Sequence, residues 1–328
     1  MNIDKKQPEA NTPIAIISNH FRHHHLSLVA FIMLLAVTLS PVVAYGENDI
    51  LTTREVKVGR FDSVRLSGCV RVEYSQGSAY AVKVVASERG QEYIKVEQKD
   101  GRLHIYTKTP KRTLAGITYS TDKNALASSK VYITSPKIAK LEADDVTEIR
   151  VAGDIKSEHL GMKLGGGASL NVTGVVSVRE LDVSLSSVAR ARFKVLSAAN
   201  ARVSAAGATT FDVKDIAAER LLLDSRTGGK MGLKTVACKE VETRVEGVGC
   251  VTFGKLKAEK ATMATQTGAE IIGEVEINGL LECHATGISK IRLTGKAGTL
   301  NETCTSMAEV SVTGNMVKTD DGVVDMCP

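Results

Sequence analysis

Three lysines recur at a fixed interval and could together bind an anion. Lys194, Lys214 and Lys234 are separated by twenty residues, and each directly follows an apolar residue. If that interval is one turn of a repeating fold, three ammonium groups are stacked on one face. Like charges directly opposite one another destabilise a sheet, so the arrangement favours an anion or an acidic polymer as ligand. The alternative is that these long side chains extend into water or protect the surface from aggregation.

The carboxylates give a weaker indication of chemistry. Cleavage of a polysaccharide needs paired carboxyl groups, one of which transfers a proton at the sugar. The nearest approximations are Asp144, Asp145 and Glu148 in one segment and Asp212, Asp215 and Asp224 in another. Exposed carboxylates are common on protein surfaces, so a solvated face is the simpler interpretation. The sequence has no nucleophile elbow and no phosphate-binding loop, and we expect no catalytic residue.

The lysines belong to a repeat that extends over much of the chain. The segments VSLSSVARARF and VSAAGATTFDV begin twenty residues apart, at Val183 and Val203. Steps of twenty residues from Val188 reach only small or β-branched residues, which are Ala168, Ala208, Gly228, Val248, Gly268, Ile288 and Ala308. A fixed period of this length is typical of a solenoid. The frame of leucine-rich repeats is missing, so a parallel β-helix is the better interpretation.

Alternation within each unit indicates strands rather than helices. Leu181, Val183 and Leu185 alternate with other residues, and neighbouring units repeat this pattern. A period of two places one face inward and one outward. The helical alternative is strongest for the Ala-rich stretch at 255–276, but that stretch keeps the twenty-residue phase. Twenty residues at about 3.3 Å each make a coil about 66 Å around, with successive coils about 4.8 Å apart.

Charged residues at the same interval support the stacking. One outward column contains Glu219, Lys239 and Glu259, and the next contains Arg220, Glu240 and Lys260. The sign alternates from coil to coil, as residues stacked a few ångströms apart prefer. Faces of helices would not require this alternation.

The N-terminus has the pattern of an export signal. Basic residues precede the apolar run at 26–44, and small residues at Val42 and Ala44 suit cleavage near Tyr45. We therefore expect residues 1–45 to be a signal peptide. The alternative is an uncleaved signal anchor, because an apolar run of this length could just span a bilayer. Either interpretation predicts that the rest of the chain is exported.

Three further parts follow the signal. We expect residues 46–135 to form an N-terminal cap with the first coils, residues 136–320 to form a regular β-helix of about nine coils, and residues 321–328 to form a tail. Within the cap, Val64, Leu66, Val70 and Val72 look like an early coil. The segments YIKVEQ and RLHIYT, joined through Lys99-Asp100-Gly101, predict a hairpin. The polar stretch at 114–130 is expected to be an exposed loop.

The stacking restricts the disulfides that the six cysteines can form. They are Cys69, Cys238, Cys250, Cys283, Cys304 and Cys327. An even count in an exported chain suggests disulfides, but a disulfide needs Cα atoms within about 7 Å. We expect Cys283 to be a buried thiol in the column of Val203 and Leu223, Cys304 to face outward beside His284, and at most one bridge within the helical body. No C-x-x-C spacing is present, so we expect neither a metal nor a redox site.

Composition limits the partners. Lys and Arg number 42 against 37 Asp and Glu, a net charge of +5, which is too small to argue for nucleic acid. Aromatic residues make up 4% of the chain and Trp is absent. The core must therefore be aliphatic, and the aromatic platforms on which sugars and bases usually stack are scarce.

Several segments resemble a known family. They are RFDSVRLSGCVRVEYSQG, AVKVVAS, KVEQKDGRLHIYT and VYITSPKIAKLEADDVTEIRV, followed by a Gly-punctuated solenoid. Together they are similar to the autotransporter adhesin head domains of exported Bacteroidetes proteins, a family of unknown function. The likeness runs from about residue 54 into the mid-200s and extends at most to residue 315. The resemblance implies a right-handed β-helix and supplies no catalytic residue.

These observations combine into one prediction. We expect an all-β, right-handed parallel β-helix with coils of about twenty residues and an N-terminal hairpin cap. We expect it to be a non-catalytic binding or structural module of the cell envelope, in the periplasm or at the cell surface, without a cofactor. Its partner would be an envelope or extracellular molecule such as an acidic glycan or a protein, not nucleic acid, with membrane contact only through the N-terminal segment. The alternatives are a carbohydrate-active enzyme on the same scaffold and a periplasmic protein-binding scaffold.

Overall fold

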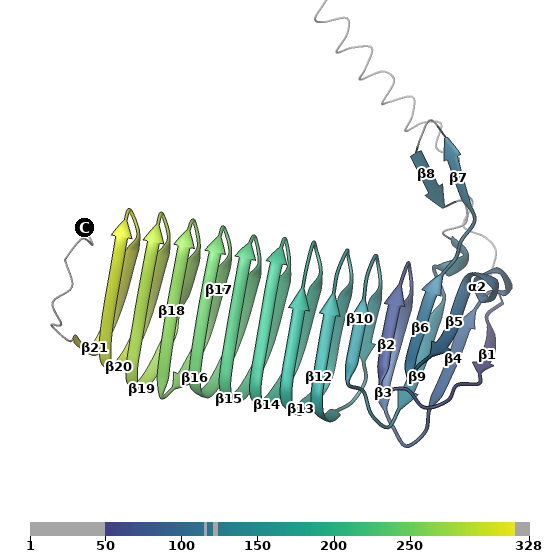
Figure 1. The fold of residues 1–328 in the computed structure, drawn as a ribbon, viewed down its shortest axis with the longest axis horizontal. Coiled ribbons are helices and arrows are strands. Elements are labelled where there is room, and N and C mark those ends of the chain that lie inside the picture. The colour runs from purple at the N-terminus through teal and green to yellow at the C-terminus, as the bar shows by residue number, and fades with distance from the viewer. Residues whose placement is uncertain (1–49, 115–116, 121–123, 319–328) are drawn as a thin grey trace, which may run out of the picture. The chain divides into compact units, whose positions relative to one another are not determined.

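The computed structural model describes residues 50–114, 117–120 and 124–318. The predicted export signal at 1–45 and the predicted tail at 321–328 lie outside the described residues. The described chain is a β-solenoid of about nine turns with parallel strands (Figure 1), which confirms the predicted fold class. Residues 50–328 make up one compact unit.

The N-terminal elements are short. They are β1 (Thr52–Val56), β2 (Ser63–Ser67), β3 (Arg71–Gln76), β4 (Ala81–Ala86), α2 (Glu88–Tyr93), β5 (Ile94–Lys99), β6 (Arg102–Thr107), β7 (Lys111–Leu114), β8 (Ile117–Ser120), the 3₁₀ helix η1 (Asn124–Leu126) and β9 (Lys130–Ser135). The body then begins with β10 (Lys140–Ala143), β11 (Glu148–Val151) and β12 (Ile155–Leu164).

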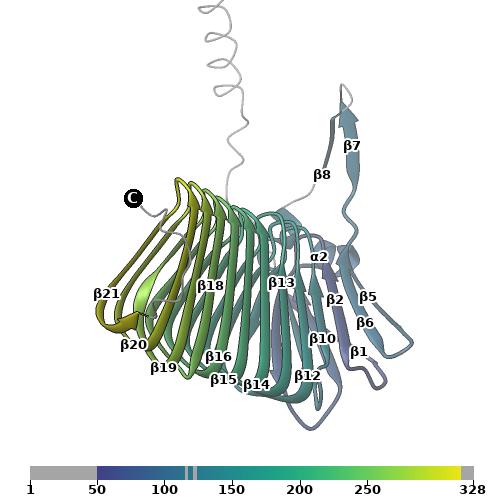
Figure 2. The ribbon, with the colours of Figure 1, turned by 60° about the vertical axis from the view of Figure 1, so that its left-hand side comes forward.

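Longer strands build the rest of the body, and most of them bend around the corners of a coil. They are β13 (Ser169–Leu185), β14 (Arg190–Gly207), β15 (Thr210–Thr227), β16 (Lys230–Gly247), β17 (Cys250–Ala258), β18 (Lys260–Thr267), β19 (Glu270–Gly287), β20 (Lys290–Ser306) and β21 (Glu309–Lys318). Figure 2 shows these coils stacked one behind another.

Each coil has three sides. In β15 the first side is residues 210–213, the second is 215–218 and the third begins at 220, because the parallel pairing with β14 is interrupted at Lys214 and Glu219. The position of Lys214 is the first corner of the coil, and the position of Glu219 is the second. The third corner follows at Thr227 and Gly228, where β15 ends.

Inward side chains form stacked columns that make the core. Val203, Leu223 and Cys283 share one such column, as predicted, and all three are 0% exposed. Phe193 and Phe211 lie in another column, with ring centroids 5.6 Å apart. Burying a large apolar side chain stabilises a fold by about 1.5–3 kcal/mol relative to exposure. The alternating pattern of the sequence therefore selects strands, and the helical alternative for 255–276 is excluded because β17, β18 and β19 occupy that stretch.

The third corner turns the chain through a left-handed backbone conformation in successive coils. The residues are Ser187, Gly207, Thr227, Gly247, Thr267, Gly287 and Ser306, with φ between 64° and 89°. Glycine suits this region because it has no Cβ. At Gly247 the space is also restricted, since a Cβ would lie 2.9 Å from the carbonyl oxygen of Thr227 on the preceding coil.

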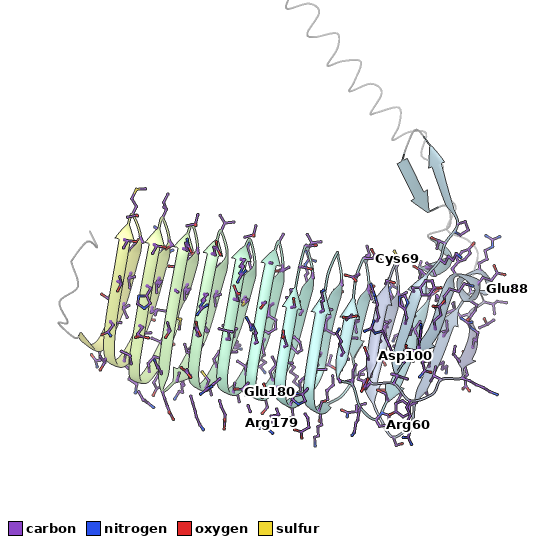
Figure 3. All side chains as sticks on the ribbon, in the orientation of Figure 1. Arg60, Cys69, Glu88, Asp100, Arg179 and Glu180 are labelled. Carbon is purple, nitrogen blue, oxygen red and sulfur yellow. The ribbon has the colours of Figure 1, made fainter. Side chains whose placement is uncertain are left out.

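Antiparallel strands cover the N-terminal end of the solenoid. The predicted hairpin is present as β5 and β6, and its turn at Asp100 and Gly101 has φ of 50° and 74° (Figure 3). β4 pairs antiparallel with both β1 and β9. The early coil is confirmed, because β2 and β3 pair parallel with β10 and β11. Such a cap protects the open edge that a solenoid would otherwise present.

The stretch at 114–130 differs from the expected exposed loop. β7 and β8 form a separate two-stranded antiparallel sheet. Ala125 and Leu126 are only 7% and 8% exposed, and Leu126 belongs to the core. The expectation is wrong because these two apolar residues are buried by tertiary contacts that the polar composition of the segment does not reveal.

Some coils are not twenty residues long, and the twenty-residue alignment is therefore wrong at Ala168 and Ala308. Backbone hydrogen bonds place Val188 level with Gly167 and Met307 level with Ile288, so Ala168 and Ala308 lie one position further on and are buried. The register between β19 and β20 also shifts between Ile277 and Leu280.

That shift overturns the prediction for Cys304. A slip of one residue moves a side chain to the other face of a strand. Cys304 therefore pairs with Ala285 and faces the core, 7% exposed, instead of facing outward beside His284.

Among the described residues, the structure contains no apolar helix of the length that a bilayer span requires.

Candidate ligand-binding site

Lys194, Lys214 and Lys234 occupy the first corner of three successive coils. Each follows a buried residue, and these buried residues pair directly from coil to coil as Phe193, Val213 and Leu233. All three lysines are exposed. The structure thus brings the three lysines to matching positions about 4.8 Å apart along the solenoid axis.

These lysines lack the partners that other stacked charges have. Within the described residues, none of the three makes an ion pair or a side-chain hydrogen bond. At the second corner, by contrast, Lys239 lies 3.4 Å from Glu219, as the alternating column predicts. The first corner therefore carries uncompensated positive charge on three adjacent coils.

The first corner borders an open groove of about 780 Å³, which we call the lysine groove. It is lined by Asn171, Val172, Thr173, Arg192, Phe193, Lys194, Asp212, Val213, Lys214, Gly232, Leu233, Lys234, Thr252 and Gly254. The groove therefore runs along the solenoid axis and crosses several coils. An extended molecule could contact every lysine in turn.

Two glycines keep this groove open. A Cβ at Gly232 would lie 2.9 Å from Oδ1 of Asp212, and one at Gly254 would lie 2.6 Å from the backbone oxygen of Lys234. Arg192 and Asp212, which also line the groove, are 3.7 Å apart and offset each other's charge. The net positive charge of the groove thus comes from the three lysines.

The three carboxylates of the second segment considered for catalysis are not brought together. Asp212, Asp215 and Asp224 lie on the first, second and third sides of one coil. Asp145 accepts a hydrogen bond of 2.8 Å from the backbone N–H of Gly68 and has φ of 61°, which is a structural role at a third corner.

Glu148 and Asp224 are engaged in ion pairs. Glu148 lies 3.2 Å from Arg71 on a neighbouring coil. Asp224 forms a two-point interaction with Arg226, at 2.9 and 3.0 Å. These contacts hold adjacent parts of the surface together and engage two of the carboxylates considered for proton transfer to a sugar.

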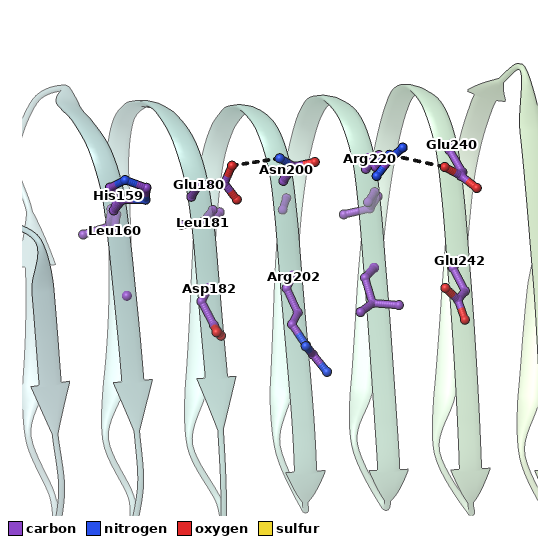
Figure 4. Close-up of a pocket in the computed structure, with 14 residues that line it drawn as sticks. His159, Leu160, Glu180, Leu181, Asp182, Asn200, Arg202, Arg220, Glu240 and Glu242 are labelled. Atoms are coloured by element: carbon purple, nitrogen blue, oxygen red, sulfur yellow. Dashed lines mark hydrogen bonds and ion pairs between the residues drawn. The ribbon is translucent and has the colours of Figure 1, made fainter.

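A second open groove, of about 720 Å³, runs along the third side (Figure 4), and we call it the mixed-charge groove. Its polar residues are His159, Glu180, Asp182, Asn200, Arg202, Arg220, Glu240 and Glu242. Glu180 accepts a hydrogen bond of 2.8 Å from the amide of Asn200, and Glu240 lies 3.5 Å from Arg220. Neighbouring coils are thus linked across this groove.

Most carboxylates of the mixed-charge groove already have a partner. Besides Glu180 and Glu240, Glu242 forms an ion pair with Arg244. Asp182 and Glu242 lie three coils apart, which corresponds to about 14 Å. Carboxylates outnumber arginines in this groove, with Glu180, Asp182, Glu240 and Glu242 against Arg202 and Arg220, whereas the lysine groove has a net positive charge.

The cysteines behave mainly as structural residues. Cys69, Cys238, Cys250 and Cys283 are free thiols, and Cys304 is disulfide-bonded. Burial, together with the charge of Glu302, raises the pKa of Cys283 to about 12, which keeps that thiol protonated and unreactive. In the described part of the chain, His, Cys, Asp and Glu side chains do not gather into a group that could hold a metal ion.

The lysine spacing was readable from the sequence, but the groove was not. Its floor depends on Gly232 and Gly254, which occupy outward positions where neighbouring coils carry Asp212 and Lys234. Glycine at an outward strand position is a signal for a hollow or a close backbone approach. The mixed-charge groove has no comparable signal, because its residues are ordinary surface types.

A family comparison identifies the class of the chain. Residues 60–255 match the model of the family described as "Putative auto-transporter adhesin, head GIN domain". This match covers more than half of the 328 residues. The chain therefore belongs to this family, which confirms the resemblance seen in the sequence. No protein with a curated function matches the chain.

Solved structures share the same fold. A putative adhesin from Parabacteroides merdae matches with a TM-score of 0.53 and 14% identity, over 81% of this chain and 98% of that chain. A putative lipid binding protein from Parabacteroides distasonis matches with a TM-score of 0.50 and 18% identity, over 83% of this chain and 98% of that chain. At these identities the likeness concerns the fold alone.

Proposed function

We propose that this protein is a non-catalytic binding module of the cell envelope and that the lysine groove binds an anionic polymer. The observation that carries the proposal is the set of three lysines without ion pairs, stacked on adjacent coils beside an open groove. Membership of a family described as an adhesin head supports a binding role. Export to the periplasm or cell surface is consistent with that family and with the N-terminal sequence.

A linear polyanion suits the lysine groove better than a small anion does. The lysines lie along the solenoid axis, so successive charges on an extended chain can meet successive ammonium groups about 4.8 Å apart. Each exposed ion pair contributes only about 0.2–1 kcal/mol. Several contacts made by one molecule are therefore needed for useful affinity, and a longer polymer should bind more tightly than a monomer.

Binding of defined polyanions tests this proposal. The probes are fluorescently labelled polygalacturonate and heparin, with dextran as an uncharged comparison, and binding is measured by fluorescence anisotropy. A triple variant carries Lys194→Gln, Lys214→Gln and Lys234→Gln. It should bind the acidic probes about tenfold or more weakly, because it loses three contacts of the size expected for exposed ion pairs. Added salt should weaken binding of the unmodified protein because it screens exposed charges.

A matched control separates the groove from general charge effects. Lys57, Lys83 and Lys95 are exposed lysines in the N-terminal part, away from the lysine groove. Replacing these three with Gln changes the net charge by the same amount. If this control loses as much affinity as the groove variant, or if neither variant changes binding, the lysine groove is not the ligand site.

The site of action requires a separate measurement. An antibody raised against residues 50–318 should label intact cells if the protein acts at the surface, and only permeabilised cells if it acts in the periplasm. Surface labelling would support adhesion to an external polymer. Labelling restricted to permeabilised cells would direct the search to periplasmic polymers and proteins.

A further inference from the structure

The third corner of the solenoid carries a line of exposed apolar side chains. Within the described residues, seven large hydrophobic side chains are exposed, and five of them lie on this line, namely Val146, Val188, Val248, Ile288 and Met307. They are between 54% and 71% exposed. Single exposed apolar residues are normal on a surface, but alignment of most of them at one corner is not expected from chance exposure.

Small residues fill the gaps in this line. Hydrogen bonds and strand register place Gly167, Ala208, Gly228 and Gly268 at the same position on the intervening coils. We call the nine residues the apolar ridge. It lies at the edge of the solenoid where the arrowheads of the long strands end in Figure 1. Nine coils at about 4.8 Å give it a length of about 38 Å.

The residues directly beside the apolar ridge are mostly small and uncharged. The left-handed residue before each ridge position is Gly, Ser or Thr except for Asp145, which precedes Val146, and the residue after it is small, as with Ala168, Ala189 and Ala269. Among charged neighbours, Arg226 is paired with Asp224 at 2.9 Å. The large residues of the ridge therefore project as knobs, and the Gly and Ala positions form notches between them.

The order of knobs and notches is self-complementary. If two ridges run antiparallel with Gly228 of each copy on a two-fold axis, Val188 of one faces Gly268 of the other. In the same arrangement Val248 faces Ala208, and Ile288 faces Gly167. Each of these contacts occurs twice, as a two-fold interface requires. At the two ends Val146 meets Met307, which is an apolar contact.

We propose that the apolar ridge is the interface for a second copy of this chain, packed edge to edge and antiparallel about Gly228. Only a partner with the same coil spacing can keep every knob in a notch along about 38 Å, and a second copy has that spacing by definition. A lipid surface suits the ridge less well, because basic and aromatic residues usually anchor proteins there and the ridge has neither. The proposal does not depend on the lysine groove, which lies at the first corner.

The narrow contact makes the dimer dependent on concentration. One corner of a solenoid buries much less area than the broad faces used by stable dimers. The geometry nevertheless fixes which residues meet. Gly228 lies on the two-fold axis, so the two Gly228 residues are adjacent, whereas the two Gly268 residues are separated by four coils, about 19 Å. A disulfide requires Cα atoms within about 7 Å.

Cysteine cross-linking therefore tests the proposal directly. The full-length chain is expressed with the exposed Cys69 and the half-buried Cys250 changed to Ser, and it carries either Gly228→Cys or Gly268→Cys. Both glycines face outward, and a Cβ at either meets its nearest neighbour at about the same distance, 3.4 and 3.3 Å. We expect a disulfide-linked dimer on mild oxidation for Gly228→Cys and little or none for Gly268→Cys. Equal cross-linking of the two variants, or none of either, would overturn the antiparallel dimer.

A second measurement separates a dimer from lipid binding. Sedimentation of residues 50–328, which form a compact unit, should show a monomer–dimer equilibrium that Val188→Lys with Val248→Lys abolishes. Thr262→Lys with Thr313→Lys, on outward positions away from the ridge, should leave it unchanged. If the protein is monomeric at all concentrations but floats with phosphatidylcholine vesicles in a manner that depends on Val188 and Val248, the ridge is a lipid contact and the proposal fails.

Discussion

The carboxylate of Glu276 lies 2.9 Å from the ammonium group of Lys257 on the preceding coil. Lys296 on the following coil lies 3.0 Å from the same carboxylate. The strand register places the three residues at one position on three coils. This arrangement is the reverse of the lysine groove, since here each positive charge has a partner.

The pairing should be visible in the titration of Glu276. Hydrogen bonds from Lys257 and Lys296 lower the pKa of its carboxyl group from 4.5 to about 2. Because the folded-state pKa lies below the unfolded value, any stabilisation from this group is present above pH 4.5 and is lost as the pH falls toward 2. Carbon-detected NMR should show the low pKa, and Lys257→Gln or Lys296→Gln should raise it. A similar rise with the distant Lys230→Gln would contradict the local cause.

The buried thiol of Cys283 should make the folded protein less stable at high pH. Burial raises the pKa of this thiol from 9.0 to about 12 in the folded protein. Above pH 9 the unfolded chain loses the proton that the folded chain keeps, so the free energy of unfolding falls by about 1 kcal/mol between pH 9 and pH 10. Urea denaturation of Cys283→Ala should show a smaller loss over this range. The exposed Cys69→Ala is the control and should keep the loss seen in the unmodified protein.

The aromatic pair in the core should be costly to disrupt. Phe211 is 0% exposed and its ring centroid lies 5.6 Å from that of Phe193. Phe211→Ala would leave a cavity and should lower the free energy of unfolding by about 3–5 kcal/mol. Phe211→Leu keeps most of the volume and should cost less. Equal losses in urea denaturation would show that the cavity is not the cause.

Substitutions at the third corner should change stability differently at its glycines and at its other residues. At Gly247, φ is 81° and a Cβ would lie 2.9 Å from the carbonyl oxygen of Thr227. We expect Gly247→Ala to destabilise the protein by about 1–3 kcal/mol, because it combines an unfavourable backbone region with a close contact. Thr267, with φ of 71°, already tolerates that region.

The reciprocal substitution is the control for this corner. Thr267→Gly removes the left-handed penalty but increases the freedom of the unfolded chain. These two effects oppose each other, so its stability should lie within about 1 kcal/mol of the unmodified protein. If both substitutions destabilise equally when melted side by side, backbone conformation does not decide the choice of residue.

Much of the candidate site followed from sequence periodicity. The twenty-residue interval predicts that Lys194 and Lys214 stand at equivalent positions, and the register of β14 with β15 places them so. The interval could not predict the groove beside them. That groove depends on the missing side chains at Gly232 and Gly254 and on the corner between two sides of the coil, neither of which is a local property.

The periodicity also failed where coils differ in length. Cys304 was expected to face outward and instead faces the core, since one residue fewer separates it from Ala285 than the average coil would give. Ala125 and Leu126 were expected to be exposed and are buried. Both errors arise from long-range contacts, which the local sequence pattern does not contain. The strand register turns Cys304 to the other face, and tertiary packing buries Ala125 and Leu126.

The strand repeat, the aliphatic core and the family resemblance can all be predicted from the sequence alone. These follow from alternation and spacing, because side chains on a strand alternate between two faces and stacked coils repeat the same environment. The three corners, with the lysine groove at one of them and the apolar ridge at another, become apparent only in the folded chain. A corner forms where strand pairing is interrupted, and which residues share it depends on the length of every coil between them.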